Sequence, residues 1–181
     1  MHLPMDKAVA SADLTYYAKR SSGSDTKGFY TGDSSYAIAM LFDGQRDAAQ
    51  SQLAFAFDHQ VGDFNIWTET DPKVASHNGT GNLNFLTGAG GFLENIVFGY
   101  GGLQYSATGL SISASLPPYN INQFTLRGIA FGDGTVRLVV NSTHQTLSRT
   151  AGGDLTVGAR GLARWPEVTV LPLGKVELRL V

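Results

Sequence analysis

Cysteine is absent from this sequence of 181 residues, so neither a disulfide framework nor a thiolate metal site can form within it. Charge is also scarce: charged residues make up 15% of the chain, and their formal net charge is only -2. A chain with so little charge has no basic surface of the kind that binds nucleic acid. No apolar run approaches the roughly 18–20 residues that span a bilayer, and the first residues lack the pattern of a signal peptide. We therefore expect no nucleic-acid or membrane partner, whereas the compartment stays open.

Motifs for metals, nucleotides and nucleophilic serine are missing as well. No Gly-Lys-Ser/Thr follows the glycines, and no Gly-x-Ser-x-Gly occurs. The histidines lie too far apart for the usual spacing of metal ligands, at positions His2, His59, His77 and His144. The sequence therefore predicts no metal and no cofactor, and it argues against a nucleotide-binding protein or a serine hydrolase.

The first half of the chain has helical periodicity. An apolar stripe recurs at spacings of four, three and four residues, at Met5, Val9, Ala12 and Tyr16. A second helix is predicted over 34–42, capped by Asp33 or Ser34 and ended by Gly44. A third is predicted from about Arg46 to Gln60, with one face formed by Ala49, Leu53 and Phe57. Helices joined by such short loops favour an array of helical hairpins.

Residues 61–86 interrupt this pattern with a long polar segment, and loops of that length are usually functional. A glycine cluster over 87–91 closes the segment. We expect a helix to follow the cluster and to be buried on most sides, because its residues are mostly apolar: Phe92, Leu93, Ile96, Val97 and Tyr100.

After Gly102 the apolar period changes to two, which predicts strands. Gly132-Asp133-Gly134 lies between two such runs and predicts a β-hairpin. Along the second run, Val136, Leu138 and Val140 should face one side. Shorter strands are expected up to the end of the chain. The sequence thus predicts a helical segment followed by a small, two-layer antiparallel β domain, an α+β organisation.

Two strings, FNIWTE (64–69) and NFLTGAGGFL (84–93), resemble the carboxyl-terminal end of the catalytic barrel in glycoside hydrolase family 65. That family includes acid trehalases and the glucosidase that trims glucosyl-galactosyl-hydroxylysine, and the trimming-glucosidase branch is the more similar. The resemblance is most specific over 64–103, moderate at SLPPYNINQFTLRGIAF (115–131) and weak beyond Arg149. It implies that 1–103 are the last helices of an (α/α)6 barrel and that 104–181 are the β domain that follows it.

The resemblance matches Glu69 to the general base of the family's hydrolases. Inverting hydrolysis needs one carboxylic acid to protonate the leaving oxygen and one carboxylate to deprotonate a water, roughly 6.5–9.5 Å apart. Trp67 would supply an apolar sugar platform or desolvate the carboxyl group. The alternative is that Glu69 is one of 15 acidic residues and lies in solvent. In the family's phosphorylases the same region binds phosphate, and the Trp-Thr-Glu triplet favours a hydrolase.

Five further residues are candidate substrate-binding groups: Thr68, Asn84, Thr87, Gly88 and Gly90. The glycines, with Gly91, can present main-chain N–H groups at a helix start, or they can allow close helix packing. Local turn hydrogen bonds are the alternative for Asn84 and Thr87. His77 in the same segment is expected to be solvated.

Nothing in residues 1–63 resembles the motif of the general acid. The first hypothesis is therefore that the chain is a fragment of an inverting enzyme acting on α-glucosides. Its partners are then the carbohydrate substrate and a missing amino-terminal part that carries the acid. The second hypothesis is a stand-alone, non-catalytic module that binds carbohydrate or another partner through its β half.

Overall fold

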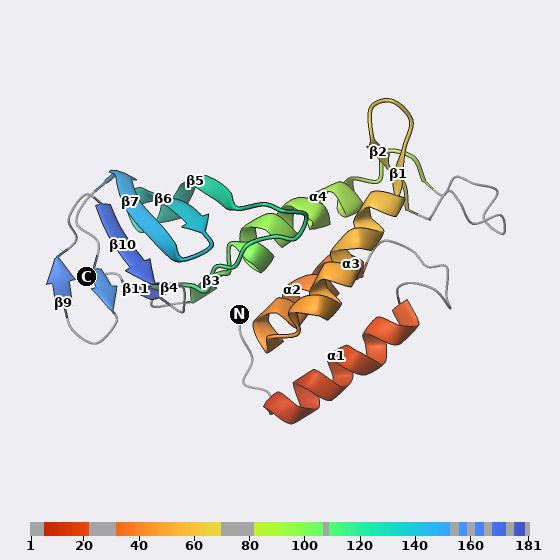
Figure 1. Cartoon of the computed structure of the whole chain (residues 1–181), viewed down its shortest axis with the longest axis horizontal. Coiled ribbons are helices and arrows are strands. Elements are labelled where there is room, and N and C mark those ends of the chain that lie inside the picture. The colour runs from red at the N-terminus through yellow and green to blue at the C-terminus, as the bar shows by residue number, and fades with distance from the viewer. Residues whose placement is uncertain are drawn as a thin grey trace. The chain divides into compact units, whose positions relative to one another are not determined.

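The computed structural model describes residues 6–21, 32–69, 82–106, 109–152, 156–158, 162–164, 168–172 and 176–179. They fall into two compact units, a helical unit within Leu3–Gly99 and a β unit within Tyr100–Val181. Helices followed by antiparallel strands confirm the predicted α+β class (Figure 1). That the helices belong to a barrel, and that the domains divide after residue 103, stay predictions.

The helical unit contains α1 (Lys7–Ser21), α2 (Asp33–Asp43), α3 (Arg46–Asp58) and α4 (Leu86–Glu94). Gly44 ends α2 as predicted, because its φ of 84° is in the left-handed region that glycine adopts without strain. The predicted amino-terminal cap is wrong. The residue preceding the helix is Gly32, so Asp33 and Ser34 lie within the first turn.

The core of this unit lies between α2 and α3. Apolar side chains from both helices are almost fully buried there, at Ala37, Met40, Ala49, Leu53 and Ala56. Leu14 and Ala18 of α1 pack against the same cluster. The prediction for α3 is thus confirmed at two of its three positions, because Phe57 remains 45% exposed.

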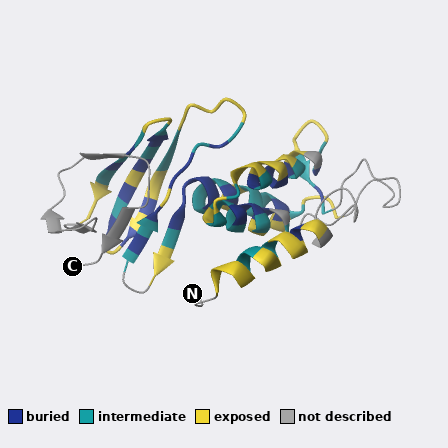
Figure 2. Cartoon of the chain, turned by 60° about the horizontal axis from the view of Figure 1, so that its bottom comes forward, coloured by how far each residue is buried: buried dark blue, intermediate teal, exposed yellow. Residues whose placement is uncertain are grey.

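Helix α1 packs through a different face from the one predicted. Val9 and Tyr16 of the apolar stripe are about half exposed, at 51% and 52%, and α1 is largely exposed in Figure 2. Instead, Ser11 Oγ donates a 2.8 Å hydrogen bond to Asp43 Oδ2, which also accepts 2.7 Å from Gln45 Nε2. The side chains of Gln45 and Ser11 and the charge of Lys7 lower the pKa of Asp43. Periodicity located an apolar stripe here, but the face of α1 that packs on the core is the one with Leu14 and Ala18.

The last helix begins earlier than expected. Helix α4 starts at Leu86, so the glycine cluster lies inside it, and a π-helical turn continues it over Asn95–Tyr100. The expected burial on most sides is also wrong, since Leu86 is 80% and Leu93 64% exposed. The buried side of the helix contains Gly88, Asn95 and Gly99. A β-carbon added at Gly99 would lie 3.0 Å from Leu41 Cδ1, so the π-helical turn and α2 approach closely there.

The β unit contains two antiparallel sheets. The four-stranded sheet has the order β10-β7-β6-β5, and the five-stranded sheet has the order β3-β4-β11-β8-β9. Their strands are β3 (Leu103–Ser106), β4 (Gly109–Ile112), β5 (Gln123–Phe131), β6 (Gly134–Asn141), β7 (His144–Ala151), β8 (Thr156–Gly158), β9 (Leu162–Arg164), β10 (Val168–Pro172) and β11 (Val176–Arg179).

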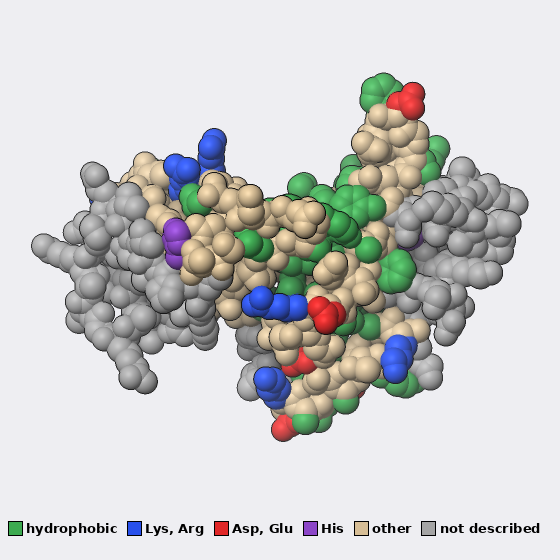
Figure 3. Space-filling model, viewed as in Figure 1, with side chains coloured by type: hydrophobic (Ala, Val, Ile, Leu, Met, Phe, Trp, Pro, Cys, Tyr) green, Lys and Arg blue, Asp and Glu red, His purple; other side chains and the backbone are tan. Residues whose placement is uncertain are grey.

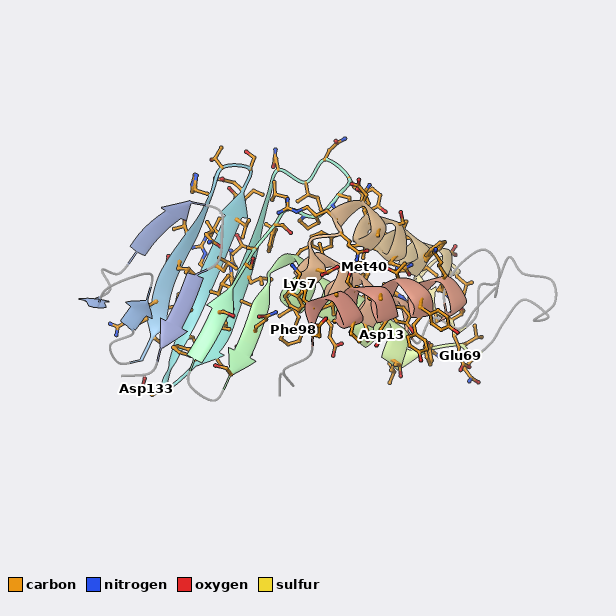
Figure 4. The ribbon with its side chains drawn as sticks, turned by 90° about the horizontal axis from the view of Figure 1, so that it is seen from below. Lys7, Asp13, Met40, Glu69, Phe98 and Asp133 are labelled. Carbon is orange, nitrogen blue, oxygen red and sulfur yellow. The ribbon has the colours of Figure 1, made fainter. Side chains whose placement is uncertain are left out.

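The hairpin of β5 and β6 forms as predicted, with Asp133 at its turn (Figure 4). Val136, Leu138 and Val140 of β6 are fully buried, which confirms the predicted face. Leu138 is paired with Leu147 of β7, also fully buried. In the other sheet, Leu110 and Ile112 of β4 are buried. The apolar face of the four-stranded sheet is thus established on β6 and β7, and that of the other sheet on β4 alone.

Gly102, immediately before β3, lies close to the main chain of Ser113. Its φ is +64°, and its carbonyl oxygen accepts a 3.0 Å hydrogen bond from the N–H of Ser113. A β-carbon at Gly102 would collide with the main chain of Ser113. Only glycine fits here without displacing the backbone.

Candidate functional site

The main chain around the Trp67-Thr68-Glu69 triplet is hydrogen-bonded to two other segments of the helical unit. On one side, β2 (Ile66–Trp67) pairs with β1 (Gln60–Val61). On the other, Thr68 forms an antiparallel bridge with Leu83, and the N–H of Phe85 donates 2.9 Å to the carbonyl oxygen of Trp67. Hydrogen bonds on both sides therefore hold the triplet's main chain in place.

Glu69 is connected to Asn82 twice. The N–H of Glu69 donates a 3.1 Å hydrogen bond to the carbonyl oxygen of Asn82, and Asn82 Nδ2 donates to Glu69 Oε2. Figure 4 shows Glu69 at one end of the helical unit. Glu69 is partly buried and Asn82 is exposed. The carboxylate of the candidate base is thus oriented by an uncharged amide, which bonds to Oε2. Its other oxygen, Oε1, accepts no hydrogen bond from the described residues.

Thr68 is completely buried. Its N–H and its Oγ1 both donate to the carbonyl oxygen of His59, over 2.8 and 3.1 Å. This hydroxyl therefore helps to hold the main chain immediately before Glu69 in place. A contact between Thr68 and a sugar stays a prediction.

Trp67 packs inward against an aromatic pair. Its ring centroid lies 5.2 Å from that of Phe92, which meets Phe57 edge-on at 5.6 Å. The indole Nε1 is buried and has no hydrogen-bond partner among the described residues. Trp67 thus joins β2 to α3 and α4, and its predicted role as a sugar platform is untested.

Asn84 and Thr87 flank the segment whose Phe85 N–H bonds to Trp67, and both residues are exposed. Asn84 adopts the left-handed conformation, with φ of 55°, which asparagine tolerates better than most residues. Both residues are therefore open to solvent, and their predicted substrate contacts stay predictions.

The candidate glycines differ in their surroundings. Gly88 lies in the first turn of α4, where main-chain N–H groups lack partners within the helix, but it is buried. Gly90 is beyond that turn, is exposed and has open space around its α-carbon. Gly91 packs closely on Ser34 of α2, so a β-carbon there would lie 2.7 Å from Ser34 Cβ. Close packing therefore explains Gly91, and substrate contacts of Gly88 and Gly90 stay predictions.

Sequence reasoning missed Asn82 and Phe92 as neighbours of the triplet. The signal for Phe92 was its place in the apolar helix after the glycines. No pattern linked Asn82 to Glu69, because residues 70–81 separate them, and these residues, with His77, lie outside the described part.

Within the described residues, no three His, Cys, Asp or Glu side chains are grouped as a metal site. Nor does any described helix combine the length and apolar character needed to cross a membrane.

No protein-family model matches the chain. It is 32% identical over 96 residues to the protein-glucosylgalactosylhydroxylysine glucosidase of Danio rerio, covering 53% of this chain and 14% of that protein. The protein of the same name from Mus musculus is 26% identical over 140 residues, covering 77% of this chain and 19% of that protein. The protein of that name from Gallus gallus is 30% identical over 131 residues, covering 72% of this chain and 17% of that protein. The chain thus spans less than a fifth of the length of these relatives.

Among solved structures, one described as a kojibiose phosphorylase from the human microbiome superposes with a TM-score of 0.63 at 16% identity. The match covers 93% of this chain and 22% of that one, and at this identity it concerns the fold alone. Together with the glucosidase relatives, it confirms the resemblance first seen in the Trp-Thr-Glu and glycine strings. The chain is related to the carboxyl-terminal portion of glycoside hydrolase family 65.

Proposed function

We propose that this chain supplies the water-activating side of an inverting glycoside hydrolase that cleaves α-glucosidic bonds of the glucosyl-galactosyl-hydroxylysine, kojibiose or trehalose type. Residues 1–103 would be the last helices of its (α/α)6 barrel and 104–181 the β domain that follows. The observation that carries the proposal is the placement of Glu69. Its main chain is held by an adjacent segment, and one carboxylate oxygen remains without a partner among the described residues.

In the proposed reaction, Glu69 takes a proton from a water molecule. The water oxygen then bonds to the anomeric carbon as the bond from that carbon to the leaving oxygen breaks. A carboxylic acid in the amino-terminal part, outside this chain, gives its proton to the leaving oxygen. Attack from the opposite face converts an α-glucoside into β-glucose.

Three features support hydrolysis over phosphorolysis for this chain. The curated relatives are named glucosidases, although the solved structure is described as a phosphorylase. A carboxylate activates water, and it repels a phosphate anion that would bind in the same place. Among the described residues, the side chain that donates a hydrogen bond to the Glu69 carboxylate is a neutral amide rather than a lysine or arginine.

The proposal can be tested in a chimera in which this chain replaces the matching segment of the Mus musculus glucosidase. With kojibiose as substrate, Glu69→Gln should lower kcat by about 10²- to 10⁴-fold, because the water loses its general base. Glu94→Gln, an exposed carboxylate on α4, is the matched control and should keep its turnover. Azide should partly rescue Glu69→Gln by attacking without deprotonation, giving β-glucosyl azide.

Near-normal kcat for Glu69→Gln would show that the base assignment is wrong. Calorimetry on the chain itself covers the alternative. Kojibiose or trehalose binding of equal affinity in wild type and Glu69→Gln would favour a stand-alone carbohydrate-binding module.

A further inference from the structure

Glu69 and Asn82 form a closed, reciprocal pair. The N–H of Glu69 donates to the Asn82 carbonyl oxygen at 3.1 Å, and the Asn82 amide donates back to Glu69 Oε2. A glutamate side chain has several rotatable bonds and otherwise samples many positions. Bonds to the same residue at both its main chain and its carboxylate therefore restrict where that carboxylate can lie.

The partner residue is itself fixed in register. Thr68, which precedes Glu69, and Leu83, which follows Asn82, form an antiparallel bridge. The Phe85 N–H bonds to the Trp67 carbonyl oxygen one step further along. Consequently Asn82 cannot slip by one residue without breaking this ladder and turning its side chain away from Glu69.

The chemistry of an amide also decides what Oε2 can do. Asn82 Nδ2 is a donor only and takes no proton from the carboxylate. While Oε2 accepts this bond, Oε1 is the oxygen that remains for a water.

We propose that Asn82 is a positioning residue for Glu69, holding Oε2 so that Oε1 receives the proton of the attacking water. This inference rests on the proposed function. It adds a residue that no sequence pattern singled out, and it predicts an effect on kcat rather than on KM.

The hydrogen bond can be tested in the isolated chain without substrate, from the side-chain amide signals of Asn82 in ¹H–¹⁵N NMR spectra. Asn82→Asp removes those signals and so assigns them. Glu69→Gln should shift them because the charged acceptor is lost, and Glu94→Gln should leave them in place. Unchanged Asn82 signals in Glu69→Gln would overturn the proposal.

The functional consequence is measured in the chimera. Asn82→Ala should lower kcat on the order of 10- to 100-fold with little change in KM, since a misplaced catalytic group costs rate rather than binding. Asn82→Gln keeps the amide and should regain part of the loss. Asn122→Ala, an exposed asparagine of the β unit, is the control and should behave as wild type.

These outcomes separate the two ideas. If Glu69→Gln retains turnover, the proposed function fails whatever Asn82 does. If Glu69→Gln loses turnover but Asn82→Ala matches Asn122→Ala, the positioning role is overturned and the base assignment stands.

Discussion

Two adjacent glycines of α4, Gly90 and Gly91, differ in whether a side chain from another helix lies against them. Gly90 faces open space, whereas Gly91 lies against Ser34 of α2. Both are helical, and glycine in a helix interior costs roughly 0.5–1 kcal/mol relative to alanine. The same substitution should therefore have opposite effects at the two positions.

We expect Gly90→Ala to raise the free energy of unfolding of the helical unit by about 0.5–1 kcal/mol, because only the glycine cost is removed. Gly91→Ala should lower it by roughly 1–3 kcal/mol, because the added methyl overlaps Ser34. Urea denaturation measures both. Adding Ser34→Gly to Gly91→Ala should recover part of the loss, and equal effects of the two single substitutions would contradict the packing.

The elements of the β unit were the easiest to predict from sequence. Alternation at Val136, Leu138 and Val140 and the Gly132-Asp133 turn are local signals, and the structure follows them. The helical unit was harder, because contacts distant in sequence outweigh local propensity. Glycines at 88, 90 and 91 argue against a helix start at Leu86, yet α4 starts there and its Gly91 lies close to Ser34 of α2.

The candidate site divides in the same way. The triplet was visible as a string, and its main-chain hydrogen bonds follow from a short β-bridge. The hydrogen bond from the Asn82 amide to Glu69 could not be predicted, because residues 70–81 separate the two in sequence. Sequence patterns report periodicity within an element and say little about which side chains meet across a long connection.

The start of the β unit offers a test at the scale of an element. Gly102 and Gly128 both have positive φ, +64° and +70°, but only Gly102 faces another main chain, that of Ser113. Gly128→Ala should cost about 1–2 kcal/mol, the strain of a left-handed alanine. Gly102→Ala should cost clearly more, because β3 and β4 must separate to admit the methyl group. Hydrogen exchange of β4 amides measures the difference, and equal protection in the two variants would argue against this close approach.

At the scale of the whole molecule, the helical unit leaves large apolar side chains of α4 exposed to solvent. Hydrophobic side chains gather over α4 in Figure 3, and Leu86 and Leu93 are 80% and 64% exposed. Apolar patches of this kind mark interaction surfaces. Under the proposed function, other helices of the enzyme's barrel would cover this face.

The isolated chain should therefore self-associate as its concentration rises. Replacing Leu86 and Leu93 together with glutamine should shift it toward monomer without lowering its melting temperature, because neither side chain packs in the core. Sedimentation velocity measures the association. As a comparison, Leu53→Gln should lower the melting temperature, since Leu53 is 3% exposed. A wild-type chain that stays monomeric at every concentration would contradict this use of the surface.

The five-stranded sheet also has a consequence for how the protein is made. Strand β11 lies between β4 and β8, so Leu178 pairs with Leu110 on one side and Val157 on the other. On the ribosome, β4 emerges long before β11 is synthesised, and it must wait with one edge unpaired. Such edges readily pair with other chains. A premature stop before Val176 would leave that edge permanently open, so we expect truncated products to aggregate rather than to persist as soluble pieces.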